Sequence, residues 1–267
     1  MLTRKRPTPP VERECTMQSA LTSWLLPFAT GIIVAVFTLL LYRQWRERRK
    51  VHQLWWTIGF AMYSAAAFME FVAQIAGGWP GWLFKVYVIV SATLVAVLAQ
   101  GSVALMSRTK TWPRLYLAYN TVCFAALVFG VATTQLIAEE LAKAALSSYA
   151  PLGGTALTYP RVMSMLLTIP GALILFWSAI LSILRFMRKR EYAYRVWANV
   201  LIATATLVIA SGGSLAKADN TTLFYLAEIV AACLYFAGFV MASTLKKGSD
   251  AIKEKRHAQD GPPTESQ

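Results

Sequence analysis

The sequence predicts an all-α membrane protein: a polytopic bundle of seven transmembrane helices with its N-terminus outside and its C-terminus in the cytoplasm. Three observations predict this class, namely the composition, seven long apolar runs, and basic residues concentrated between those runs. Of the 267 residues, 57% are hydrophobic and 15% are charged, and the mean hydropathy is +0.48. A soluble domain has roughly a quarter of its residues charged. The lipid bilayer is therefore the expected solvent.

The spans follow from the length of each apolar run. A helix needs about 20 predominantly apolar residues to cross a hydrocarbon core about 30 Å thick. Seven runs meet this requirement, and together they form a helical domain over residues 23–245 between two polar tails, 1–22 and 246–267. The predicted spans are 24–42, 54–77, 81–106, 115–137, 162–184, 196–215 and 222–244.

The residues beside each run set its limits. The first run follows the polar tail and ends at the basic stretch RQWRERRK, and the second opens with two tryptophans. The turn GGWPG joins the second run to the third, which ends at the basic loop SRTK before the fourth. An outer connection over 138–161 follows, whose first half is expected to form a short helix. The fifth run contains Pro170, which should free backbone carbonyls; the sixth follows the basic stretch RKREYAYR, and a short polar segment precedes the seventh.

The distribution of Lys and Arg predicts the orientation, because cytoplasmic loops carry an excess of positive charge. With the N-terminus outside, eighteen of the twenty-six basic residues fall in four inner segments, which are 43–50, 108–114, 185–195 and 246–256. Four more lie in the polar N-terminal tail, on the predicted outer side. Translation that begins at Met17 would remove them. An intact mass that includes residues 1–16 would rule out this hypothesis.

Several classes of function lack the residues that they need. The cysteines have no CxxC spacing and the two histidines lie outside the apolar runs, so we expect no metal site and no haem. No HExxH, GxSxG, P-loop or GxGxxG pattern occurs, and the seventh run contains no lysine for a retinal Schiff base. The net charge of +13 lies in short clusters between spans, which favours a membrane surface over nucleic acid. We predict no cofactor and no catalytic residue.

Ionisable residues inside a spanning helix are costly and are the first candidates for function. Three occur, Glu70, Lys85 and Glu228, and at 1.5 Å per residue they lie roughly 10, 6 and 9 Å below the predicted outer edge. Helical spacing aligns further polar side chains with the two glutamates. We therefore predict a polar, aromatic-lined pocket that opens to the outside and binds a ligand or a proton, formed by Glu70, Glu228, Lys85, Gln74, Tyr63 and Tyr225.

A purely structural interpretation of two of these residues stays open. Glu70 and Lys85 belong to consecutive antiparallel helices joined by a tight turn, and an ion pair between them would fix the packing of those helices. Glu228 has no cation near it in sequence, which makes it the stronger functional candidate.

A basic loop followed by Trp56, Tyr63, Glu70, Lys85 and Tyr87 across two consecutive helices resembles the seven-helix N-terminal sensor region of some bacterial histidine kinases. The resemblance implies a role in sensing an extracellular or membrane-dissolved signal near Glu70. No kinase or other output domain follows residue 245, so we expect a sensor-like or accessory subunit of the bacterial inner membrane that works with a protein partner. The alternative is a small secondary transporter, coupled to protons, and an intramembrane lipid-modifying enzyme is a more distant third.

Overall fold

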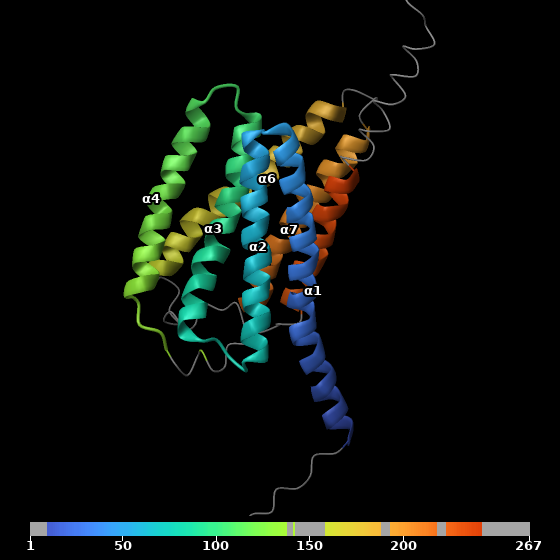
Figure 1. Cartoon of the computed structure of the whole chain (residues 1–267), viewed down its shortest axis with the longest axis vertical. Coiled ribbons are helices and arrows are strands. Elements are labelled where there is room, and N and C mark those ends of the chain that lie inside the picture. Colours follow the sequence, from blue (N-terminus) through green and yellow to red (C-terminus); the bar gives the residue numbers. More distant parts are fainter. Residues whose placement is uncertain (1–9, 138–140, 142–157, 188–192, 218–222, 242–267) are drawn as a thin grey trace, which may run out of the picture.

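The computed structural model describes residues 10–137, 141, 158–187, 193–217 and 223–241. This part of the chain contains seven long helices and no strand, so the all-α class is confirmed (Figure 1). Apart from Leu141, the predicted helix in the first half of 138–161 lies outside the described residues, and so does the polar tail over 246–267. The helices are α1 (Pro10–Arg48), α2 (Val51–Ile75), α3 (Gly81–Met106), α4 (Thr111–Thr133), α6 (Tyr159–Met187), α7 (Ala193–Lys217) and a last helix over Leu223–Met241.

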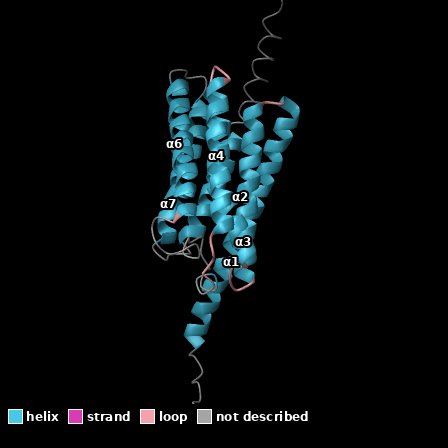
Figure 2. Cartoon of the chain, turned by 90° about the vertical axis from the view of Figure 1, so that its left-hand side faces the viewer, coloured by secondary structure: helices cyan, strands magenta, loops and turns pink. Residues whose placement is uncertain are grey.

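Six of the seven helices contain a segment long and apolar enough to cross a membrane, which supports a multi-pass membrane protein. The described apolar part of α7 is shorter, Val196–Ile209, so a seventh crossing and the orientation of the termini stay predictions. The first helix begins at Pro10, well before the predicted start of its span at residue 24. Its N-terminal part projects beyond the bundle (Figure 2). The six candidate spans are Trp24–Arg48, Val51–Ile75, Gly81–Met106, Thr111–Thr133, Tyr159–Leu184 and Leu223–Met241.

The turn between α2 and α3 makes these helices an antiparallel pair. Gly77 and Gly78 have positive φ angles of 70° and 155°, conformations that glycine adopts without a side-chain clash. The amide of Gly78 donates to the carbonyl of Ala73 at 3.0 Å and thus satisfies one of the carbonyls left free at the end of α2. Pro80 then precedes the first residue of α3. Residues at equal distances from this turn therefore lie opposite each other.

The interior is divided between two clusters of buried side chains. The first joins α2, α3, α4 and α6 around Phe84, Leu127 and Leu167, all three fully buried. The second joins α1, α2, α3, α7 and the last helix around Val34, Phe60 and Tyr235. Both clusters include α2 and α3, which lie at the centre of the bundle (Figure 1). The α2–α3 turn consequently positions side chains relative to both halves of the molecule.

Pro170 lies inside α6, and the helix continues through it. Because proline has no amide hydrogen, the carbonyl of Leu166, four residues earlier, receives no bond from within the helix. The hydroxyl of Tyr119 on α4 donates to this carbonyl at 2.7 Å. The prediction that Pro170 frees a carbonyl is thus confirmed, and the neighbouring helix supplies the missing donor. Next to it, Gly171 lets α6 approach the backbone of α3, since an added Cβ would lie 3.1 Å from the nitrogen of Ala96.

Candidate functional site

A cluster of buried polar side chains lies near the end of the bundle where α2 turns into α3. Its centre is Glu70 on α2, with Tyr87 on α3 and Glu228 on the last helix. Only 1% of Glu70 and 8% of Glu228 is exposed. Two residues from helices far apart in the sequence thus share a buried site. The predicted opening to the outside does not expose either glutamate.

The hydrogen bonds of Glu70 define the centre of the site. The hydroxyl of Tyr87 donates to Oε1 of Glu70 at 2.5 Å, a length typical of a strong bond to a carboxylate. The carboxyl groups of Glu70 and Glu228 also lie within hydrogen-bonding reach of each other. Two ionised carboxylates both accept and neither donates, so a hydrogen bond between them requires one bound proton. The arrangement suits an acid and its conjugate base that share a proton.

The surroundings of the second oxygen of each carboxyl group support a shared proton. Oε2 of Glu70 and Oε2 of Glu228 are both buried, and neither accepts a hydrogen bond from a donor group of the described residues. An unsatisfied buried acceptor costs about 1–3 kcal/mol, and more when it is charged. A single proton between the two carboxyl groups reduces both the unmet acceptor capacity and the repulsion of like charges.

Two further hydrogen bonds connect α2 to the last helix on either side of the carboxyl pair. The hydroxyl of Tyr63 donates to the backbone carbonyl of Glu228 at 3.0 Å. The amide Nε2 of Gln74 donates to the hydroxyl of Tyr225 at 2.9 Å. The structure therefore brings together five of the six residues that the sequence singled out, which are Glu70, Glu228, Gln74, Tyr63 and Tyr225.

Lys85 is the residue that does not join the site. Its Nζ donates to the carbonyl of Ala132 at 3.1 Å, near the C-terminal end of α4. The last carbonyls of a helix have no partner within the helix and attract cations, so this contact serves to cap α4. No ion pair between Glu70 and Lys85 occurs among the described residues. The interpretation of these two residues as a structural ion pair is therefore wrong.

Tyr87 takes the place in the site that was expected for Lys85. The sequence placed it only within the resemblance to kinase sensor regions, and not among the binding residues. Residues 85 and 87 lie two positions apart, about 200° around the helix, so they point to opposite sides of α3. Trp79 packs on the ring of Tyr87, with their centroids 4.7 Å apart. A contact farther along the last helix was also missed: Thr206 Oγ1 and the hydroxyl of Tyr235 lie 2.9 Å apart.

The chemistry available to this site is the binding and release of a proton or of a hydrogen-bonding ligand. Within the described part of the chain, no group of three or more metal-ligating side chains occurs. The carboxyl pair, three tyrosine hydroxyls and one amide are the polar groups that the contacts above bring together. No family model matches the sequence, and neither the curated proteins nor the solved structures show a match.

Proposed function

We propose that this chain is a sensor-like or accessory membrane subunit whose Glu70–Glu228 pair is a proton-binding reception site. The observation that carries the proposal is the contact between two buried carboxyl groups, which a bound proton makes favourable. The role of a subunit that works with a protein partner follows the resemblance to kinase sensor regions at Glu70 and Tyr87.

Loss of the shared proton would change how α2 packs against the last helix. Two unit negative charges about 4 Å apart repel each other by about 4 kcal/mol at an effective dielectric constant of 20. A free energy of this size changes the ratio of two conformations by roughly a factor of 1,000. Because Tyr63 and Gln74 also connect these two helices, separation of the carboxyl groups strains both hydrogen bonds. Proton occupancy at the site is thereby coupled to helix packing.

The position of the carboxyl groups favours a sensor over a transporter. A proton-coupled transporter needs a polar path that reaches both faces of the membrane. Glu70 and Glu228 are the only carboxyl groups buried among the described side chains, and both lie near the α2–α3 end of the bundle. A site at one end suits a group that exchanges protons with one side of the membrane and passes the change on through packing.

Infrared spectroscopy of the protein in lipid vesicles tests the proton directly. We expect a C=O stretch from a protonated carboxyl group that disappears as the pH rises, and that changes in Glu70→Gln and in Glu228→Gln. Glu47→Gln, on the exposed end of α1, is the matched control and should leave the band unchanged. The absence of such a band from the wild type at every pH, with the helical signal intact, would contradict the proposal.

Purification from native membranes in mild detergent tests the role. A protein that copurifies with the wild type, and whose retention changes in Glu228→Gln, supports a subunit that transmits the protonation state. Proton-coupled solute flux by the chain alone in liposomes would favour the transporter instead.

A further inference from the structure

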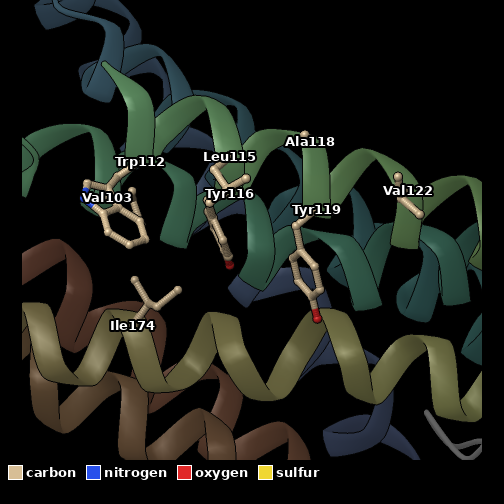
Figure 3. Close-up of a pocket in the computed structure, with 8 residues that line it drawn as sticks. All are labelled: Val103, Trp112, Leu115, Tyr116, Ala118, Tyr119, Val122 and Ile174. Atoms are coloured by element: carbon tan, nitrogen blue, oxygen red, sulfur yellow. The ribbon is translucent and has the colours of Figure 1, made fainter. Parts of the chain in front are cut away.

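A groove of about 720 Å³ opens on the side of the bundle between α4 and α6, away from the carboxyl site. Figure 3 shows Trp112, Tyr116 and Tyr119 reaching from α4 toward α6, with Ile174 facing them from α6. Val103 on α3 completes the wall. The side chains are apolar or aromatic, and Trp112 is 66% exposed. In a membrane-spanning bundle this groove opens toward the lipid.

One end of the groove is fixed by a bond between the helices. The hydroxyl of Tyr119 donates to the carbonyl of Leu166, so this ring bridges α4 and α6 (Figure 3). The ring of Tyr116 stacks beside it, with centroids 6.1 Å apart and planes inclined by 21°. A hydrogen bond therefore holds together the two helices that form the groove.

The length of the groove matches one leaflet of a bilayer. Its lining on α4 extends from Trp112 in the first turn to Val122, which at 1.5 Å per residue is about 15 Å. The hydrocarbon core is about 30 Å thick, so the groove covers half of it. It begins at the loop that connects α3 to α4. A single acyl chain from the leaflet on that side fits this span.

The end of the groove at this loop carries positive charge. Arg108, Lys110 and Arg114 are all exposed and flank Trp112 in the sequence. Each basic residue near a bilayer surface attracts anionic lipid headgroups. An apolar groove that ends at three cations is complementary to a lipid with two apolar tails and an anionic head.

We propose that this groove binds an acyl chain of an anionic glycerophospholipid, whose phosphate lies against Arg108, Lys110 and Arg114. A helix of a second protein is the competing occupant. Interfaces between membrane helices are enriched in small residues that let backbones approach closely. The groove offers mainly Trp, Tyr, Leu, Ile and Val, with Ala118 as its one small residue, and therefore favours a lipid chain.

Native mass spectrometry of the full chain, released from vesicles of phosphatidylglycerol and phosphatidylcholine in equal parts, tests the proposal. We expect the wild type to retain phosphatidylglycerol preferentially. Ile174→Trp, which fills the groove, should lose most of the retained lipid. Leu173→Trp is the matched control, because Leu173 neighbours it on α6 but is 63% exposed and does not line the groove, and it should retain lipid like the wild type.

Two further variants separate the tail from the headgroup and guard against misfolding. Val103→Trp fills the groove from α3 and should reproduce the loss, so that one unstable variant does not decide the outcome. Replacement of Arg108, Lys110 and Arg114 by Gln should reduce the preference for phosphatidylglycerol roughly a hundredfold. Equal retention of lipid by Ile174→Trp and Leu173→Trp, or release of the wild type as a complex with a second protein chain and no lipid, would overturn the proposal.

Discussion

Tyr87 and Tyr119 each form a hydrogen bond between helices, in two regions of the molecule that differ in burial and in the acceptor group. Each donates its hydroxyl to an oxygen of a neighbouring helix, Tyr87 to the carboxyl group of Glu70 and Tyr119 to the backbone carbonyl of Leu166. Tyr87 is buried, whereas Tyr119 is 37% exposed on the groove side. A carboxyl group changes its charge with pH and a backbone carbonyl does not. The bond of Tyr87 is therefore sensitive to pH, whereas the bond of Tyr119 only holds two helices together.

The largest expected difference between the two regions comes from deletion of one carboxyl group. Glu70→Ala should lower the free energy of unfolding by about 3–5 kcal/mol, because it leaves Glu228 and the hydroxyl of Tyr87 buried without their partner. Glu70→Gln keeps the size and the hydrogen-bonding capacity and should cost about 1 kcal/mol. Unfolding in detergent micelles measures both. Equal losses in the two variants would show that the carboxyl group itself, and neither side-chain size nor the hydrogen bonds of an amide, decides stability at this position.

Removal of the Tyr87 hydroxyl should have the next largest effect. Tyr87→Phe should cost about 1.5–3 kcal/mol, the usual contribution of a hydrogen bond to a group that carries charge. The ring still packs on Trp79, so the helical content should be unchanged. The same unfolding assay measures the loss, and the carboxyl C=O stretch should shift because Glu70 loses a donor. A shift without loss of stability would mean that a water molecule replaces the hydroxyl.

The pH dependence of stability should also distinguish the regions. The proposed shared proton belongs to the folded state, in which Glu70 and Glu228 are buried, whereas the unfolded chain exposes both carboxyl groups and releases it at neutral pH. On this proposal the folded state binds more protons. Stability then falls as pH rises through the loss of that proton, by about 1.4 kcal/mol per pH unit at most. Unfolding measured across a pH series should show this slope in the wild type. Replacement of both Glu70 and Glu228 by Gln should flatten it, whereas Tyr119→Phe should leave the slope unchanged.

The smallest effect is expected on the groove side. Tyr119→Phe removes the donor to the carbonyl freed by Pro170 and should cost about 1 kcal/mol, as is typical of hydrogen bonds between membrane helices. Neighbouring water or lipid headgroups do not reach this carbonyl inside the hydrocarbon core, so the loss should exceed that of Tyr42→Phe at an exposed position of α1. Calorimetry on the two variants in the same detergent compares them. A larger loss than in Tyr87→Phe would reverse the ranking of the two contacts.

The sequence predicted the carboxyl site better than it predicted the groove, for physical reasons. Burying a charged group is costly, so Glu70 and Glu228 stand out in apolar runs, and the rise per residue gives their depth without knowledge of the packing. Depth alone does not distinguish Lys85 from Tyr87, because both lie near the same end of α3. The direction in which α3 turns toward α2 decides between them, and that direction follows from packing between helices.

The groove depends on contacts that no local pattern contains. Its lining residues come from α3, α4 and α6. The hydrogen bond at its end joins a tyrosine of α4 to a backbone carbonyl of α6, far away in the sequence. Pro170 did indicate that some carbonyl would lack its donor. The sequence does not indicate which side chain supplies the donor, since any hydroxyl or amide on a neighbouring span serves equally well.

The separation of Glu70 and Glu228 along the chain has a consequence for biosynthesis. Glu70 and Tyr87 flank a single turn and enter the membrane together, whereas Glu228 follows only after α4, α6 and α7. At about 5–20 residues per second, ribosomal synthesis takes about 7–28 s to cover that interval. During this time the nascent chain holds half of the site, with Glu70 bonded to Tyr87 alone. Arrival of the last helix completes the proposed proton-sharing pair, so the site is assembled last, when the other described helices have already been synthesised.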